Sequence, residues 1–316
     1  RFQFNIERLA ASGGHLLVAS DIGARVFAMS FGSMTSVAEF QIPSSIMEIL
    51  GENVFVANGK ELEVRTIQGE VKQTIEIEAN SAIAHMIING KYLCLATQNS
   101  QTLQIFLFDV SRRVPKLVGS SSFAIKNKIY RVRSIAVSRG GFCVSISLDF
   151  FTHGQWEISS KLYLHSPIKQ KTVALSVPNG SPINHLWDTV SGRLLVVQTP
   201  TTVTPFFVNT SLETSQLRQI SMGIDRLIFK IETPRILHVI DGSKGPPLSV
   251  DGSVSASIMC QFSTLDGMDS STRRILIEIF FAIQTDQRES ALQMVQGLND
   301  EFVERAALRF CLSIKE

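Results

Sequence analysis

The stretch from Pro182 to Thr189 holds a histidine, a tryptophan and an aspartate within four positions: His185, Trp187 and Asp188. A histidine near an aspartate can serve a hydrolase as general base and orienting carboxylate, provided that a nucleophile joins them. The sequence marks no nucleophile, because no G-x-S-x-G motif occurs. As a metal site the stretch offers two ligands at a poor spacing. We therefore interpret it as a polar turn that leads into an apolar strand at 193–198, with Trp187 packed between structural units.

Other chemical signatures are also missing from the sequence. It contains no G-x-G-x-x-G, no G-x-x-x-x-G-K-[ST] and no H-E-x-x-H motif. The cysteines are too far apart for a C-x-x-C motif, and we expect buried, unpaired thiols at Cys94, Cys143, Cys260 and Cys311. We predict no catalytic residue, no metal-binding residue, no cofactor-binding residue and no cofactor.

A repeated pattern of short apolar runs supplies the elements that would position any functional side chain. An apolar run, a turn and a second, alternating run recur at steps of 38 to 52 residues from five markers, namely Leu16, Val54, Leu93, Cys143 and Leu195. Alternation with period two indicates strands, and a period of about 40 residues is typical of propellers. The sequence thus predicts a WD40-like β-propeller over 1–240, with about five to six blades visible. Closed propellers usually hold about six to eight blades, and the chain starts in a strand-like run at Arg1, so we expect one or two blades upstream.

The pattern changes after residue 240. Residues 241–261 contain a Gly-Pro cluster and a serine-rich stretch, which indicate a linker. Over 262–316 the apolar period becomes 3.6, which predicts helices at 275–283, 288–296 and 301–314. Short helices joined by tight turns are typical of helical repeats. The predicted fold class is therefore mostly β with an α tail, namely a propeller, complete or incomplete, followed by the first helices of a TPR-like α-solenoid.

The chain carries a basic segment between Asp109 and Asp149, where no acidic residue occurs. Because the net charge of the whole chain is only +2, we predict no nucleic-acid partner. The segment is a candidate interaction patch for an acidic partner surface or an anionic membrane. The alternative is a solvated sheet edge, where basic residues prevent edge-to-edge pairing. The patch comprises Arg112, Arg113, Lys116, Lys126, Lys128, Arg131, Arg133 and Arg139.

Three stretches, taken together and in order, resemble a known family. They are the F-D-x-S-R-R run at 108–113, the P-x-N-H-x-W-D run at 182–188, and a set in the tail at Phe262, Asp269, Thr272, Arg273, Phe280, Phe281, Ala291 and 309–312. This combination is similar to the large propeller-and-solenoid subunits of intraflagellar transport complex A, over roughly residues 100–316. The Trp-Glu pair of that family's third helix is absent, and Val303-Glu304 stands near its place.

The resemblance implies a non-catalytic scaffold, made of a second propeller and the start of the helical repeats. It implies a role in retrograde ciliary transport and in the entry of membrane cargo into the cilium. The implied partners are other complex A subunits and ciliary cargo adaptors. Peripheral contact with an anionic membrane is expected from the basic segment alone. The implied locations are the cytoplasm, the cilium or flagellum, and the basal body.

Two alternatives stay open. One is another propeller-plus-solenoid subunit of a coat or vesicle-trafficking assembly. The other is a propeller hydrolase, which would need two carboxylates at the central channel. We expect the strands nearest the axis to include 82–84 and 134–137, and these offer small apolar residues rather than carboxylates. That composition disfavours the hydrolase.

Overall fold

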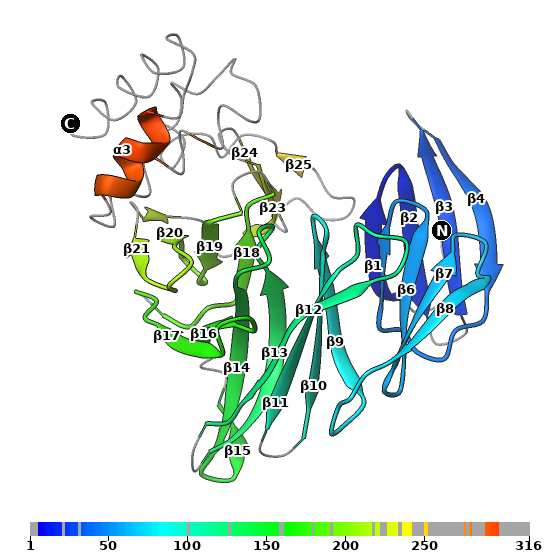
Figure 1. Ribbon diagram of the computed structural model, residues 1–316, viewed down its shortest axis with the longest axis horizontal. Helices are drawn as coiled ribbons and strands as arrows, with labels where there is room; N and C mark the ends of the chain where they lie inside the picture. The colour runs from blue at the N-terminus through cyan, green and yellow to red at the C-terminus, as the bar shows by residue number, and fades with distance from the viewer. Residues whose placement is uncertain are drawn as a thin grey trace. The chain divides into compact units, whose positions relative to one another are not determined.

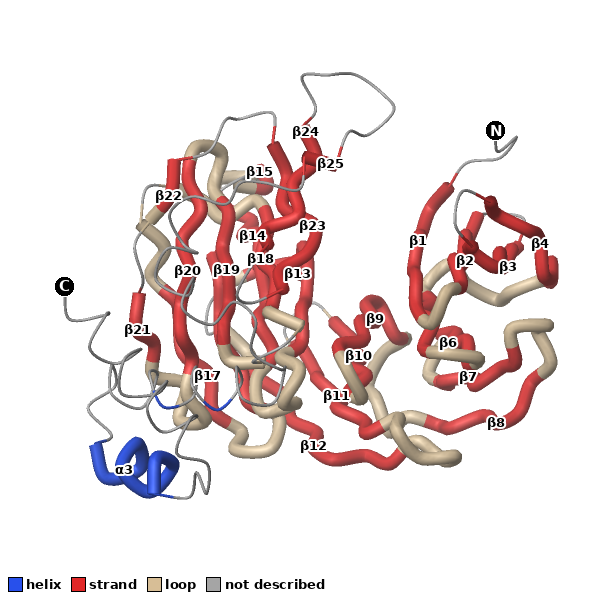
Figure 2. Tube along the Cα trace, turned by 90° about the horizontal axis from the view of Figure 1, so that it is seen from above, coloured by secondary structure: helices blue, strands red, loops and turns tan. Residues whose placement is uncertain are grey.

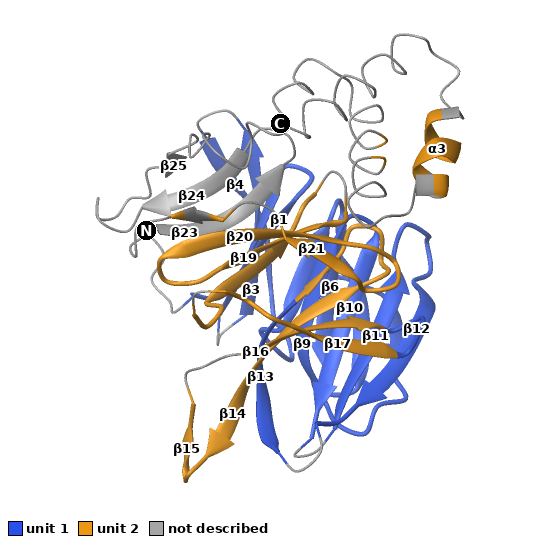
Figure 3. Cartoon of the chain, turned by 90° about the vertical axis from the view of Figure 1, so that its left-hand side faces the viewer, with its two compact units in different colours: residues 1–135, 167–170 blue, residues 136–166, 171–316 orange. Residues whose placement is uncertain are grey.

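The structure is a computed structural model of the chain. It describes residues 6–20, 23–30, 33–99, 102–125, 128–157, 161–178, 180–189, 192–216, 219–221, 226–232, 236–241, 250–251, 275, 279 and 288–296. The chain divides into two compact units, of which unit 1 holds residues 1–135 and 167–170 and unit 2 holds the remainder (Figure 3). Within the described residues, the strands form six antiparallel sheets, which we number in chain order.

The first three sheets lie in unit 1, and each has four strands in chain order (Figure 1). The first sheet contains β1 (Ile6–Ser12), β2 (His15–Ser20), β3 (Gly23–Ser30) and β4 (Ser33–Phe40). The second contains β5 (Met47–Leu50), β6 (Asn53–Asn58), β7 (Glu61–Thr66) and β8 (Val71–Glu76). The third contains β9 (Ile83–Asn89), β10 (Tyr92–Gln98), β11 (Leu103–Asp109) and β12 (Lys116–Phe123), whose succession Figure 2 shows. The predicted repeat of four-stranded modules is confirmed here.

The next three sheets continue the pattern. The fourth contains β13 (Ile129–Val137), β14 (Val144–Thr152), β15 (Gln155–Trp156), β16 (Lys161–Ser166) and β17 (Lys171–Leu175). The fifth contains β18 (Asn184–Trp187), β19 (Leu194–Gln198), β20 (Thr202–Val208), β21 (Thr214–Gln216) and β22 (Ile220–Ser221). The sixth contains β23 (Arg226–Glu232), β24 (Ile236–Asp241) and β25 (Val250–Asp251). β25 lies within the range that the sequence indicates as a linker.

Apolar side chains from consecutive sheets form the cores. In unit 1, one core joins the second and third sheets and includes Phe55, Leu62, Leu93 and Phe106. In unit 2, another joins the fourth and fifth sheets and includes Leu162, Trp187, Leu195 and Phe206. Alternation along each strand places these residues on the faces that meet. Within each unit, these consecutive sheets therefore bury facing sides against each other, which is how propeller modules pack.

The first strands of the sheets in unit 1 contact one another, β1 with β5 and β5 with β9. Arg8 on β1 links all three: its Nη2 donates to Glu48 on β5 and, over 2.8 Å, to the carbonyl oxygen of Met86 on β9. Two strand positions that we expected nearest the axis, 82–84 and 134–137, fall at β9 and β13, which are first strands of their sheets.

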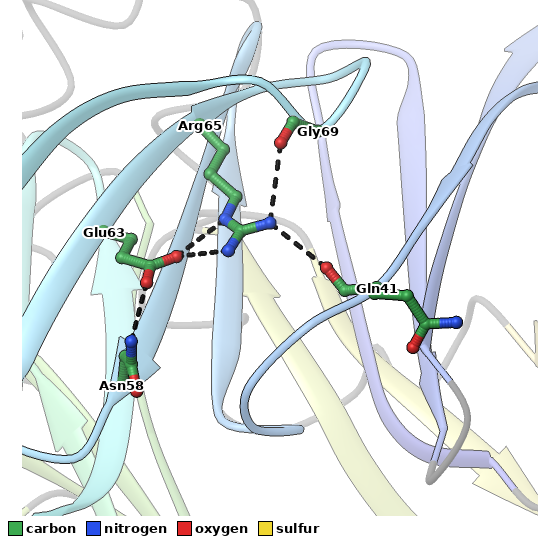
Figure 4. Close-up of polar contacts among 5 residues, drawn as sticks. All are labelled: Gln41, Asn58, Glu63, Arg65 and Gly69. Atoms are coloured by element: carbon green, nitrogen blue, oxygen red, sulfur yellow. Dashed lines mark hydrogen bonds and ion pairs between the residues drawn. The ribbon is translucent and has the colours of Figure 1, made fainter.

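A second polar network holds the link between the first and second sheets, as Figure 4 shows. Arg65 on β7 pairs with Glu63, whose other oxygen accepts a 2.8 Å hydrogen bond from Asn58. The same guanidinium donates to the carbonyl oxygen of Gln41, which follows the first sheet, over 3.1 Å. The turn at Gly69 packs closely against the first sheet, because a Cβ built on Gly69 would lie 2.4 Å from Cγ of Phe40.

The helix predicted at 288–296 is confirmed as α3 (Arg288–Gln296). Residues 275 and 279 of the first predicted helix are helical, and the predicted third helix lies outside the described residues. Most of the linker range also lies outside them, so the domain limits and the helical-repeat character of the tail stay predictions. In the part of the chain that the structure describes, no helix is long and apolar enough to cross a membrane.

Candidate functional site

Two of the three residues that first suggested chemistry, His185 and Trp187, lie on a strand rather than in a turn, and Asp188 follows that strand. β18 pairs antiparallel with β19, with His185 opposite Val197 and Trp187 opposite Leu195. The prediction of a polar turn is therefore wrong. Side chains alternate along β18, so His185 and Trp187 occupy its buried face, and a buried polar side chain requires a hydrogen-bond partner.

That partner is Ser145 on β14, a residue that the sequence did not mark. Its Oγ lies 2.8 Å from Nδ1 of His185 and accepts a 3.0 Å hydrogen bond from Nε1 of Trp187. The carbonyl oxygen of Ala136 lies 3.3 Å from the same Oγ. The single hydroxyl proton goes to this carbonyl when Nδ1 of His185 carries a proton, and to Nδ1 when it does not. We call Ser145, His185 and Trp187 the Ser145 clip; it joins the fourth sheet to the fifth within unit 2.

The Ser145 clip has the residue types of a hydrolase and the environment of a structural contact. A nucleophilic serine must reach its substrate, and both Ser145 and Asp188 are 0% exposed. The hydroxyl oxygen already has three polar partners. Trp187 packs edge-on against Phe142, with ring centroids 6.0 Å apart. Trp187 also belongs to the core shared by the fourth and fifth sheets, so the prediction that it packs between two repeated modules is confirmed.

Burial favours the neutral form of three other ionisable groups in unit 2 and unit 1. Burial lowers the pKa of His165 to about 4, and its Nδ1 lies 2.8 Å from Oγ1 of Thr172. Burial raises the pKa of the thiols of Cys94 and Cys143, which are unpaired as expected. Such thiols are poor nucleophiles. Cys260 and Cys311 lie outside the described residues. Among those described, no group of His, Cys, Asp and Glu side chains could hold a metal ion.

The sequence did not lead us to Glu48, a buried carboxylate on a first strand. Glu48 lies in the apolar run of β5, and burial raises its pKa despite the opposing effect of Arg8. On the neighbouring β9, burial and then the Arg8 charge lower the pKa of His85. The signal available in the sequence was a single acidic residue within the apolar run Met47–Leu50. Its ion pair with Arg8 gives Glu48 a structural use, as a link between first strands.

The predicted basic patch is distributed over two sheets. Arg112 and Arg113 lie in the connection between β11 and β12, and Lys116 begins β12, an edge strand of the third sheet. Arg131 and Arg133 lie on β13, an edge strand of the fourth sheet, and alternate there with buried residues. All five are exposed, as are Lys128 and Arg139. Arg139 belongs to unit 2, and Lys126 lies outside the described residues.

Comparisons with known proteins agree with this architecture. A family model described as "IFT140 second beta-propeller" matches residues 1–167, more than half of the chain. No curated protein sequence matches the chain. Similar solved structures include KlHsv2 with loop 6CD replaced by a Gly-Ser linker, at 13% identity and a TM-score of 0.51, covering 70% of this chain and 73% of that one. They also include the Neurospora crassa Pan2 WD40 domain, at 12% identity and a TM-score of 0.48, covering 76% of each chain.

The first of these structural matches shows likeness of fold alone, because its sequence identity is low. The family match carries further, and it agrees with the resemblance to complex A subunits in the sequence. The part of the chain that the structure describes consists of successive antiparallel sheets with shared cores, as a propeller requires. The chain therefore belongs to the IFT140 second beta-propeller family, a family related to intraflagellar transport complex A and to the cilium.

Proposed function

We propose that the chain acts as a non-catalytic scaffold within intraflagellar transport complex A. The family match over residues 1–167 is the observation that carries this proposal. The local chemistry supports it, because the serine and histidine that resemble a catalytic pair are buried in the Ser145 clip. Packed sheets linked by buried polar contacts make a rigid platform whose loops can bind several partners.

In this role the chain supports retrograde ciliary transport and the entry of membrane cargo into the cilium. Its partners are other complex A subunits, together with cargo adaptors, and its exposed basic residues contact acidic partners or an anionic membrane. It works in the cytoplasm, at the basal body and in the cilium. Residues 262–316 begin a TPR-like solenoid that offers a second binding surface after a propeller at 1–240. The helix α3 agrees with that proposal.

Affinity purification from ciliated cells tests the assembly role. A tagged form of the complete protein should recover complex A subunits, and its loss should leave transported cargo at the ciliary tip. Recovery of vesicle-coat subunits in place of complex A subunits would favour the alternative trafficking assembly. Recovery of neither, together with normal cilia after depletion, would contradict the proposal.

A separate measurement addresses the hydrolase alternative. A fluorophosphonate probe labels activated serines, and we expect no labelling of the native chain at Ser145. The Ser145→Ala variant is the matched control for that position, because any signal specific to this serine disappears in it. Labelling of native protein that Ser145→Ala abolishes would show an accessible nucleophile, and the non-catalytic assignment would then fail.

A further inference from the structure

A surface groove in unit 1 lies between the second and third sheets. It has a volume of about 740 Å³ and is lined by Asn53, Val64, Lys72, Gln73, Arg113 and Val114. Asn53, Val64 and the pair Lys72–Gln73 come from β6, β7 and β8, and Val64 lies directly opposite Gln73 in the ladder. The other wall comes from the connection that precedes β12. We call this the Arg113 groove; its volume suits a few side chains of a bound segment.

The charge of the Arg113 groove has one sign. Among the residues that the structure describes, its lining holds two cations, Lys72 and Arg113, and no carboxylate. Lys72 Nζ donates to the neutral amide oxygen of Asn53 over 2.6 Å, which leaves its charge uncompensated. In the described part of the chain, neither cation forms an ion pair. The exposed Arg112 and Lys116 flank the groove in sequence and add to its positive potential, while the exposed Glu52 beside Asn53 offsets part of it.

The remaining lining residues favour a polypeptide over a flat surface. Asn53 and Gln73 supply amide groups that can hydrogen-bond a peptide backbone. Val114 is 57% exposed, so an apolar side chain of a ligand can bury against it, whereas Val64 is 4% exposed and forms the closed floor of the groove. An extended peptide can place an apolar side chain between two acidic side chains. A lipid bilayer presents a broad surface of headgroups, which cannot enter the groove in this way. The combination of amides, valines and two cations therefore selects an extended acidic segment.

We propose that the Arg113 groove binds an extended, acidic segment of a partner protein, with glutamate or aspartate side chains placed against Lys72 and Arg113. This inference rests on the proposed scaffold function in one respect, because the groove is one of the docking sites that a scaffold needs. It also divides the predicted basic patch. Arg113 contributes to the groove, whereas Arg131 and Arg133 lie on another sheet.

Fluorescence anisotropy with a labelled Glu-Glu-Val-Glu-Glu peptide tests the proposal on the complete chain. We expect saturable binding that weakens with added salt, and no binding of the Gln-Gln-Val-Gln-Gln peptide. Lys72→Glu and Arg113→Glu should each weaken binding roughly tenfold, since each replaces a charge-assisted contact by repulsion. Lys60→Glu is the matched control, because it makes the same charge change at an exposed lysine in the turn between β6 and β7, outside the groove lining.

Circular dichroism should show equal melting temperatures for all three variants, which separates loss of binding from loss of fold. The proposal is overturned if the acidic peptide does not bind, or if Lys60→Glu weakens binding as much as Arg113→Glu. It is also overturned if Lys72→Glu and Arg113→Glu reduce binding to phosphatidylserine vesicles and leave peptide binding unchanged. Recovery of complex A subunits is a separate readout, so the groove and the scaffold role can fail independently.

Discussion

Replacing Ser145 by alanine should destabilise unit 2 far more than the loss of one small hydroxyl suggests. The substitution leaves Nε1 of Trp187 and Nδ1 of His185 without the oxygen that lies 3.0 and 2.8 Å away. Both rings are buried, at 4% exposure each. An unsatisfied buried polar group costs about 1–3 kcal/mol, so we expect the free energy of unfolding to fall by about 2–5 kcal/mol. That is a large part of the stability of an ordinary domain.

The chain supplies a matched control two residues away on the same strand. Ser147 is 2% exposed, and its Oγ is buried without a hydrogen-bond partner. Because its hydroxyl is already unsatisfied, Ser147→Ala should be neutral or slightly stabilising. The assay is urea unfolding followed by far-ultraviolet circular dichroism. If Ser145→Ala costs no more than Ser147→Ala, the Ser145 clip does not stabilise the fold and our reasoning fails.

A double-mutant cycle separates the indole contact from general packing. Trp187→Phe removes the N–H donor while keeping an aromatic ring. In the Ser145→Ala background no hydrogen bond is left for it to break, so the double variant should cost less than the sum of the two single variants. We expect a difference of about 1 kcal/mol. Strict additivity would show that the 3.0 Å contact contributes nothing.

Three further predictions concern other positions in the sheets and turns. Because the pKa of His165 falls from 6.5 in the unfolded chain to about 4 on folding, the folded state excludes the proton. Stability should therefore decrease by about 3 kcal/mol as the pH falls from 6.5 to 4, and His165→Gln should flatten this dependence in urea titrations. Gly69→Ala should lower the unfolding free energy by about 2–4 kcal/mol, since its φ is +93° and the new Cβ meets an aromatic ring. Gly59→Ala, at φ +61° with nothing within 4 Å, should cost only about 1 kcal/mol, and equal losses would contradict the steric argument. Arg65→Met should cost about 3 kcal/mol because it strands Glu63, and adding Glu63→Leu should restore part of that loss in the same assay.

The sequence predicted the strands that are buried on both faces better than any others. The markers Leu16, Val54, Leu93 and Leu195 all fall on second strands of their sheets, and Cys143 immediately precedes one. Second strands have a neighbour on each side and core on each face, so they carry continuous apolar runs. An edge strand such as β4 is mostly exposed, and its sequence carries little apolar signal.

The Ser145 clip was only half visible in the sequence. His185 and Trp187 are conspicuous residue types, but a serine is common and carries no mark of its own. Ser145 lies 40 residues before His185, and only the packing of the fourth sheet on the fifth brings them together. The turn was wrongly predicted for a related reason. Polar residues favour turns when they lack partners, and a partner contributed by another sheet cannot be read from local sequence.

The buried and the exposed charged or polar residues of this chain serve different ends. The contacts of Arg8 with Glu48 and of Ser145 with His185 each cross from one sheet to another within a unit. They resist sliding of the sheets, because a shifted sheet would leave buried polar groups unpaired. Arg112, Arg113 and Lys116, in contrast, are exposed, and in the described part of the chain none of them pairs with a carboxylate. A rigid interior fixes the backbone that carries these exposed residues, so binding has less backbone conformational entropy to remove. Substitutions that destabilise the interior should therefore lower the affinity for partners that bind at the surface. A chain weakened at Arg8 should bind an acidic partner less tightly, although Arg8 does not line the Arg113 groove.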